Sequence, residues 1–137
     1  MSTAAYLGGC FCGRVRYRAT GDATNLCFCH CTSCRRAVGA SPVARATFAK
    51  QCFAITSGRL AEHRSSPQVT RGFCAHCGTS LTYCHDNRAA DIDVTLMSLD
   101  EPTLLVPGAH IWVQDKLPWV KIDAGQPQFE KFRSDSP

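Results

Sequence analysis

The chain has 137 residues, of which 45% are hydrophobic and 19% are charged, and its formal net charge is +4. This length predicts one domain with a modest core, and the composition is typical of a globular protein. No apolar run reaches membrane-spanning length, and the start MSTAAYLGGC lacks the features of a secretory signal. We therefore expect a cytoplasmic protein without a membrane partner, with one domain over residues 1–137 and its core at about 6–123.

Short strands and one short helix are predicted in chain order. Residues 14–19 (RVRYRA) alternate with period two, as in a half-buried strand, and 25–28 could form a second strand. Residues 32–38 suit one or two helical turns, with Thr32 or Ser33 as the N-cap and Gly39 as the stop. Further strand candidates are separated by turn signals such as Ser-Gly and Ser-Pro, and they are 43–48, 52–56, 60–63, 68–73, 79–83, 91–96, 110–113 and 119–122.

Closely and regularly spaced short strands predict an all-β domain. The last dozen residues are polar and without pattern, so residues 124–137 are expected to form a loose tail.

Seven of the ten cysteines fall into three tight clusters: CFC at 10–12, CHCTSC at 29–34 and CAHC at 74–77. In a reducing compartment such short spacing indicates metal ligands rather than disulfides. Seven thiols make one complete four-coordinate site and one site that is a ligand short. Zinc with four protein thiolates is closed and structural, whereas zinc with three keeps a position for water or substrate.

The two outer clusters each supply two thiols, and together Cys10, Cys12, Cys74 and Cys77 would close a four-thiol site. Glycines flank both pairs, as expected where backbone amides must point at thiolates. The alternative is two unrelated pairs of buried or reactive cysteines. Iron in a rubredoxin-like site has similar spacing, so spacing alone leaves the metal open.

The middle cluster places Cys29, Cys31 and Cys34 within six residues, where metal binding would protect three adjacent thiols from oxidation. Arg35 and Arg36 follow directly and can offset the negative charge of the site. A fourth ligand is not evident: the weaker candidates are Cys27, His30, His76 and His85. The isolated Cys52 and Cys84 are expected to be small hydrophobic residues in or near the core.

The positive charge does not by itself indicate a nucleic-acid partner. Seven thiolates binding two divalent ions would leave a net charge of about +1. The basic residues are also dispersed, and Arg14, Arg16 and Arg18 are expected on the solvated face of a strand.

Four motifs in order carry a resemblance to a known family. They are Gly9-Cys10-Phe11-Cys12-Gly13 with Val15-Arg16-Tyr17, Cys29-His30-Cys31-x-x-Cys34-Arg35, Arg71-x-Phe73-Cys74-x-x-Cys77-Gly78, and His110-Ile111-Trp112 with Pro118-Trp119. Their order and spacing resemble the glutathione-dependent formaldehyde-activating enzyme and centromere protein V family, from about residue 7 to about residue 122.

The resemblance implies a fold of small coiled antiparallel sheets, a β-tent, pinned by a zinc. It implies structural zinc at Cys10, Cys12, Cys74 and Cys77, and catalytic zinc at Cys29, Cys31 and Cys34. It implies a carbon–sulfur lyase that condenses glutathione, or another thiol, with formaldehyde or a related aldehyde. Arg35, Arg36 or Arg71 would then pair with the carboxylates of glutathione. His110 and Trp112 match motif positions and are expected to pack beneath the metal layer.

Two alternatives to a lyase stay open at this level. The domain could be a non-catalytic zinc module that binds a protein or chromatin partner, or a redox sensor that uses the middle cluster. The sequence specifies neither the oligomeric state nor the physiological thiol.

Overall fold

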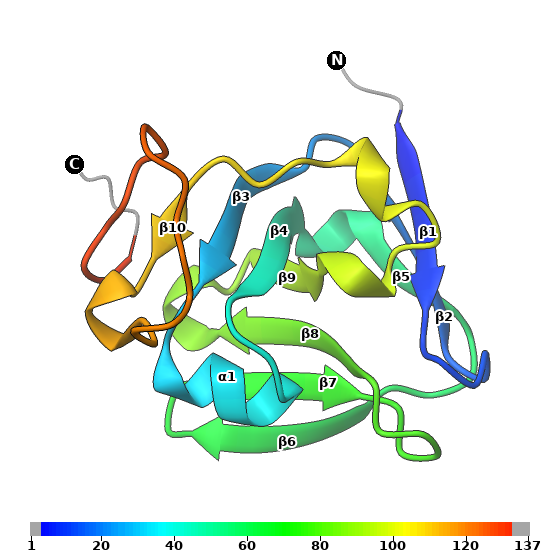
Figure 1. The fold of residues 1–137 in the computed structure, drawn as a ribbon. Coiled ribbons are helices and arrows are strands. Elements are labelled where there is room, and N and C mark those ends of the chain that lie inside the picture. Colours follow the sequence, from blue (N-terminus) through cyan, green and yellow to red (C-terminus); the bar gives the residue numbers. More distant parts are fainter. Residues whose placement is uncertain (1–3, 133–137) are drawn as a thin grey trace.

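Ten short strands form two sheets in the computed structural model, which describes residues 4–132 (Figure 1). The predicted all-β fold of small antiparallel sheets is confirmed. No helix among the described residues is long and apolar enough to cross a membrane.

The smaller sheet is antiparallel in the order β1-β2-β5, with bounds β1 Ala5–Gly9, β2 Arg16–Thr20 and β5 Phe53–Ser57. Strand β1 was absent from the sequence prediction, because its Gly8-Gly9 end is poor in strand-forming residues. The structure requires glycine there: a Cβ on Gly8 would lie 2.4 Å from the ring of Tyr17. The close approach of the Tyr17 side chain to the backbone of β1 therefore explains why this strand carries a glycine at position 8.

The larger sheet has the order β10-β3-β4-β9-β8-β7-β6. All its neighbours are antiparallel except β10 and β3, which run parallel. The bounds are β3 Thr24–Cys29, β4 Val43–Ala49, β6 Ala61–Ser66, β7 Val69–Phe73, β8 Ser80–His85, β9 Asp91–Thr95 and β10 His110–Ile111. Each of these strands overlaps a predicted one.

Helix α1 spans Thr32–Val38, as predicted, and ends at Gly39 in the left-handed conformation (φ 80°). The predicted N-cap was wrong by one or two residues. Cys31 takes that place, because its Sγ accepts a hydrogen bond from the amide of Cys34 at 3.2 Å. The 3-10 turns are η1 Lys50–Cys52, η2 Asp86–Arg88, η3 Leu96–Ser98, η4 Pro102–Leu104 and η5 Val113–Asp115.

Two predictions near the C-terminus were wrong. Residues 119–122 form no strand, and Trp119 is 73% exposed, so the apolar pair Trp119-Val120 does not belong to a buried strand. Residues 126–131, expected to be loose, hydrogen-bond along β10 instead. The part of the predicted tail at 133–137 lies outside the described residues.

The core consists of two clusters of buried side chains. The larger one packs between the sheets and includes Tyr17, Phe48, Leu81 and also two of the outer cysteines, Cys10 and Cys74. The smaller one lies beside α1 and comprises Cys27, Cys29, Cys34, Val43 and Ile111. Both cysteine groups are therefore integrated into the hydrophobic core.

Tyr17 makes the protein less stable as the pH becomes alkaline. Its side chain is 1% exposed, its hydroxyl shares a 2.7 Å hydrogen bond with Ser98 Oγ, and burial raises the pKa of Tyr17 to about 12. Because the folded-state pKa lies above the unfolded one, the stabilisation is complete below pH ~10 and is lost as the pH rises through 12.

We expect the difference in unfolding free energy between the native protein and Tyr17→Phe to shrink by about 2 kcal/mol between pH 9 and pH 11.5. Urea denaturation of both proteins at the two pH values measures this. A difference that stays constant over that range would contradict it.

Candidate metal centres and the adjoining cavity

The four outer cysteines meet at one point, as predicted. Cys10 and Cys12 lie in the turn after β1, Cys74 and Cys77 in the turn after β7, and their four Sγ atoms all lie within 4.8 Å of one another. The Cys10–Cys12 and Cys12–Cys74 Sγ distances are 3.6 and 3.8 Å. Tetrahedral zinc with bonds of about 2.3 Å needs sulfur–sulfur separations of about 3.8 Å, so this donor set could hold such an ion.

Local backbone geometry favours thiolates in this four-thiol cluster. Gly13 and Gly78, both at φ 83°, turn the chain after each pair. The amide of Val15 donates to Cys10 Sγ at 3.2 Å. Hydrogen bonds from the hydroxyl and backbone of Thr79 lower the pKa of Cys77 to about 5. These hydrogen bonds therefore keep the Cys77 sulfur in the thiolate form at neutral pH, which is the form that binds a metal ion.

The middle cysteines also converge. Cys29 ends β3, Cys31 caps α1, and Cys34 sits on its first turn, so the strand-to-helix corner gathers all three within 4.8 Å. The Cys29 and Cys34 Sγ atoms are 3.7 Å apart, again the edge of a tetrahedral thiolate site. Among the described residues no further cysteine, histidine or carboxylate joins this group. The three-thiol cluster is therefore one protein ligand short, as the sequence predicted.

None of the four weaker ligand candidates joins the three-thiol cluster, although one of them, His85, lines the cavity beside it. Cys27 is buried on β3 two residues before Cys29 and lies outside the three-thiol cluster, and His76 is exposed. His30 is fully buried, and its Nε2 lies 2.8 Å from His110 Nδ1. Cys84 packs against the larger core cluster, as expected, and Cys52 is half-buried at η1.

His110 and Trp112 differ in their surroundings. His110 is buried, stacks on Phe28 with ring centroids 4.9 Å apart, and places its Nε2 2.8 Å from Gln126 Oε1. The Gln126–His110–His30 chain thus ties β10 to β3 and to the C-terminal segment, which is a packing role. Trp112 is half-buried and faces a cavity instead.

Two buried arginines approach the three-thiol cluster. Arg45 Nη1 and Arg71 Nη2 lie 4.0 and 3.7 Å from Cys34 Sγ, and both guanidinium groups lie over the ring of Tyr83, at 4.7 and 5.0 Å from its centroid. Hydrogen bonds from the Cys29 and Cys31 thiols, followed by the charges of Arg45 and Arg71, lower the pKa of Cys34 to about 2. The arginines therefore stabilise negative charge on this sulfur.

The two arginines differ in the negatively charged groups that face them. Arg45 Nη1 lies 3.4 Å from Asp93 Oδ2. Burial alone would lower the pKa of Arg45, but Asp93 and the cysteine sulfurs outweigh burial and raise this pKa well above its ordinary value. Asp93 also accepts from Thr47 Oγ1 at 2.6 Å and from Arg88 Nη2 at 3.0 Å. Arg71 is 9% exposed, donates through Nε to Ser65 Oγ at 3.1 Å, and has no carboxylate partner in residues 4–132.

A cavity of about 330 Å³ opens onto this cluster. Cys29, Cys31 and Cys34 line it together with Arg45, Arg71 and Tyr83, and the residues that complete it are Thr32, Ser33, Ser65, Ser66, Val69, His85, Trp112, Asp115 and Phe132. Burial raises the pKa of Tyr83, so its phenol in the cavity wall is neutral at physiological pH. The four-thiol cluster does not line this cavity, so the two cysteine groups have different access to ligands.

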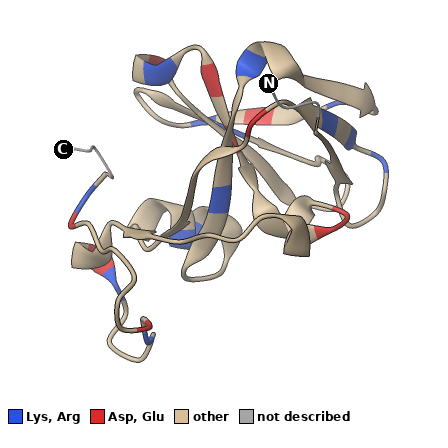
Figure 2. Ribbon diagram, turned by 90° about the horizontal axis from the view of Figure 1, so that it is seen from above, with Lys and Arg blue, Asp and Glu red and all other residues tan. Residues whose placement is uncertain are grey.

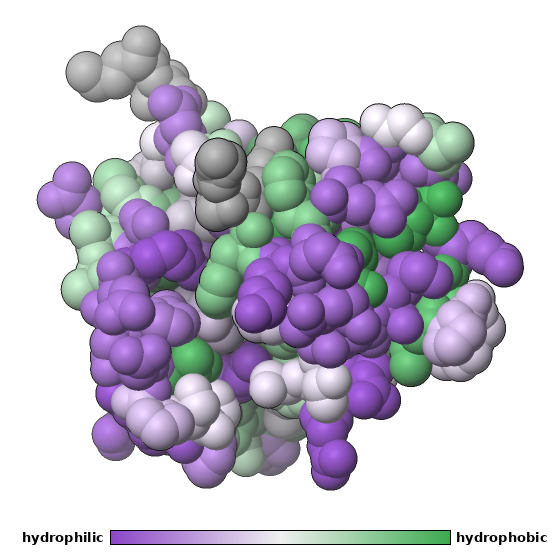
Figure 3. Space-filling view, turned by 90° about the vertical axis from the view of Figure 1, so that its left-hand side faces the viewer, coloured by the Kyte–Doolittle hydropathy of each residue, from purple (hydrophilic) through white to green (hydrophobic). Residues whose placement is uncertain are grey.

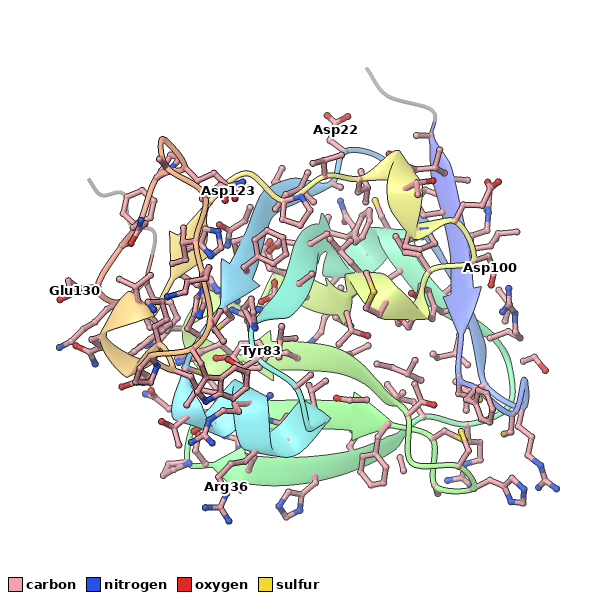
Figure 4. The ribbon with its side chains drawn as sticks, in the orientation of Figure 1. Asp22, Arg36, Tyr83, Asp100, Asp123 and Glu130 are labelled. Atoms are coloured by element: carbon pink, nitrogen blue, oxygen red, sulfur yellow. The ribbon has the colours of Figure 1, made fainter. Side chains whose placement is uncertain are left out.

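Of the three arginines predicted to bind glutathione carboxylates, only Arg71 lines the cavity. Arg71, on β7, lies in the cavity wall beside α1. Arg36 is exposed and points away from the molecule, whereas Tyr83 lies in the interior near α1 (Figure 4). Arg35 is half-buried, and neither it nor Arg36 lines the cavity.

Sequence reasoning missed Arg45 and Tyr83. The signal for Arg45 is a lone arginine inside the apolar strand VARATFA, since a charge at such a position needs a buried partner. Basic residues elsewhere are spread over several elements rather than gathered in one stripe (Figure 2).

Known proteins resemble this chain in sequence and in fold. The family model described as glutathione-dependent formaldehyde-activating enzyme matches residues 5–115. A curated Schizosaccharomyces pombe protein named as an uncharacterized lyase is 28% identical over 82 residues, which cover 60% of this chain and 59% of that protein. The chain thus aligns with less than two thirds of that relative's length.

The crystal structure of a Rhodobacter sphaeroides protein is similar in fold. It superposes with a TM-score of 0.58 at 19% sequence identity and covers 90% of this chain and 98% of that one. At this identity the likeness concerns the fold alone.

Proposed function

The chain belongs to the glutathione-dependent formaldehyde-activating enzyme family, and from this premise we propose that it is a zinc-dependent carbon–sulfur lyase. Its reaction would be the reversible addition of a thiol, glutathione or a related one, to formaldehyde or another small aldehyde. The name of the yeast relative, a lyase, supports the reaction class.

One observation carries the proposal: of the two thiol clusters, the one that lacks a fourth protein ligand is the one that lines the cavity. A closed four-thiol site suits a structural ion, and a three-thiol site suits an ion that accepts a ligand from solution. The sulfur spacings of both clusters fit zinc. We propose that Cys10, Cys12, Cys74 and Cys77 hold a structural zinc, and that Cys29, Cys31 and Cys34 hold a catalytic one.

When bound at the three-thiol cluster, zinc would supply a positive charge that lowers the pKa of an incoming thiol. The chain's own residues add to this field. Arg45 and Arg71 direct positive charge at Cys34 Sγ from one wall of the cavity, and Asp93 balances only the first of them. Because Arg71 has no carboxylate partner in residues 4–132, it favours a further anion in the cavity beside the Cys34 sulfur.

Arg71 suits one carboxylate of glutathione. Its Nε donates to Ser65 and its Nη2 lies against Cys34, and Arg71 lines the cavity, so its remaining guanidinium donors are available for a ligand there. A buried guanidinium without a carboxylate is costly, and a substrate carboxylate would relieve that cost through charge-assisted hydrogen bonds.

The proposed chemistry conserves atoms and electrons. The thiol sulfur uses a lone pair to form a bond to the aldehyde carbon, the carbonyl π pair moves to oxygen, and the proton given up by the thiol ends on that oxygen. The product is an S-hydroxymethyl thioether, and the reverse reaction returns the thiol and the aldehyde.

The test begins with elemental analysis of protein purified without chelator, for which we expect about two zinc ions per chain. Exchange NMR then measures the rate at which glutathione and formaldehyde form their adduct, over the spontaneous background. We expect Cys31→Ala to lower the enzymatic rate on the order of 100-fold or more. Two zinc ions without any acceleration over background would refute the lyase proposal.

Arginine variants in the same assay locate the carboxylate. Arg71→Met should raise the KM for glutathione about tenfold and leave the KM for 2-mercaptoethanol, which has no carboxylate, unchanged. Arg36→Met is the matched control, because that side chain is exposed and outside the cavity. Equal effects on both thiols would show that Arg71 acts without binding a carboxylate.

A further inference from the structure

The cavity wall includes a residue from outside the part of the chain that the family model matches. The match ends at residue 115, whereas Phe132 lines the cavity. The segment that carries Phe132 lies beside β10, on the left of Figure 1. This segment is thus an element of the site that shared family sequence does not account for.

Hydrogen bonds hold residues 126–131 along β10 and η5. The amide of His110 donates to Pro127 O at 2.9 Å, and the amide of Phe129 donates back to His110 O at 2.9 Å. The amides of Trp112 and Val113 donate to Lys131 O and Phe129 O at 3.0 and 3.1 Å. Two side chains add to the attachment: Gln126 reaches His110, and Phe129 packs on the smaller core cluster beside Cys29 and Cys34.

These contacts place Phe132 between Trp112 and His85, which both line the cavity. Its ring meets Trp112 edge-on with centroids 5.3 Å apart and meets His85, at the end of β8, with centroids 6.3 Å apart. Phe132 is 48% exposed, so it forms the outer part of the wall rather than its floor. Figure 3 shows the face that carries this segment, where hydrophilic residues surround scattered apolar ones.

Trp112, the inner partner of Phe132, has a strained backbone. Its φ of 56° is in the left-handed region, which is uncommon for a bulky residue and costs about 1–3 kcal/mol. The hydrogen bond from its amide to Lys131 O belongs to the contacts that hold this conformation. The C-terminal segment therefore fixes both rings of the Trp112–Phe132 pair.

The size of the cavity decides what this pair can do. A volume of about 330 Å³ corresponds to roughly ten water molecules of liquid. A tripeptide thiol occupies about this volume, so with its thiol arm at the three-thiol cluster its remaining atoms would reach the outer wall, where Phe132 stands.

We propose that Phe132 is a specificity-determining residue: by bridging Trp112 and His85, it admits slender thiols and small aldehydes to the three-thiol cluster and excludes branched or aromatic reactants. Its role as a substrate filter rests on the proposed function. Its role in access to Cys31, the half-buried member of the cluster, does not.

The test measures access directly on the purified full-length protein. Cys31 is labelled with iodoacetamide, which is small, or with N-(1-pyrenyl)maleimide, which is bulky and aromatic, and peptide mass spectrometry follows each rate. Phe132→Ala should raise the pyrene rate about tenfold or more while the iodoacetamide rate stays within about twofold. Phe132→Trp should lower the pyrene rate below that of the native protein.

Trp119→Ala is the control, since Trp119 is an exposed aromatic residue that does not line the cavity. An unchanged ratio of the two rates in Phe132→Ala would overturn the proposal. So would an equal rise of both rates, because it would show general loosening of the segment.

Activity separates the two proposals. If native protein converts formaldehyde but Phe132→Ala gains nothing in kcat/KM for benzaldehyde and shows no change in the labelling ratio, only the filter fails. If the labelling ratio changes as expected but native protein does not accelerate adduct formation, the filter stands and the lyase proposal fails.

Discussion

Cys74→Ser is expected to abolish cooperative folding, whereas Cys31→Ser is expected to lower the melting temperature by only a few degrees. Cys74 is 1% exposed and belongs to the larger core cluster, where its sulfur and that of Cys12 are 3.8 Å apart. Structural zinc sites contribute about 10–16 kcal/mol of apparent binding free energy, and whole domains are stable by about 5–15 kcal/mol. Loss of the proposed four-thiol zinc would therefore remove more free energy than the folded domain has available.

Cys31 is less critical to the fold. It is half-buried and caps α1, and serine is itself a preferred N-cap residue whose hydroxyl can accept the bond from the Cys34 amide. The substitution should therefore cost the fold no more than about 1 kcal/mol, which corresponds to a few degrees. Circular dichroism melts with metal analysis of both variants measure the contrast. Cys52→Ser is the control, because Cys52 lies outside both clusters. If the Cys31 variant unfolded and the Cys74 variant melted normally, the structural and catalytic assignments would be reversed.

Local sequence patterns predicted much of this fold. The bounds of α1 follow from the polar residues before it and from Gly39, and strands such as 91–96 follow from alternation. Cysteine spacing identified the three-thiol cluster and each pair of the four-thiol cluster, because ligands two or three residues apart converge locally. That the two pairs meet was predicted from their donor count, and the fold brings them together from positions 62 residues apart. Strand β1 could not be found this way, since its glycines are explained only by the approach of Tyr17 from a neighbouring strand.

The rest of the site depends on sheet register, which no local pattern contains. Asp93 pairs with Thr47 on one side and with Tyr83 on the other, and this register sets Asp93 beside Arg45 and Tyr83 beneath two guanidinium groups. In sequence the period-two pattern of 91–96 marked Ile92, Val94 and Leu96 as the core face. On the opposite face Asp93 is also buried, whereas Asp91 and Thr95 are only partly buried, and the partners that make burial of Asp93 possible come from other elements.

The C-terminal segment was missed for a similar reason. Polar residues 126–131 have no core-facing pattern, and only the unpaired edge of β10 gives their backbone groups partners.

The buried ion network leads to the second large prediction: Asp93→Ala should lower the unfolding free energy by about 3–5 kcal/mol. Asp93 is 2% exposed and is shared by Arg45, Arg88 and Thr47. Its removal leaves the Arg45 guanidinium buried without a carboxylate, facing only cysteine sulfurs such as that of Cys34 at 4.0 Å. Urea denaturation measures the loss, with Asp91→Ala as the matched control on the same strand, since Asp91 is partly exposed and its ion pair with Arg88 is worth about 0–1 kcal/mol.

A second substitution separates the charge from the lost packing. If the cost arises from an unpaired buried cation, then Arg45→Met in the Asp93→Ala background should recover a large part of it, because an apolar side chain of similar length needs no counter-ion. Additive losses in the double variant would show instead that the two residues stabilise the sheet independently. A third result would be recovery of stability together with a weakened metal affinity of the three-thiol cluster. It would show that Arg45 stabilises the thiolates that it faces, and that Asp93 is needed to neutralise Arg45.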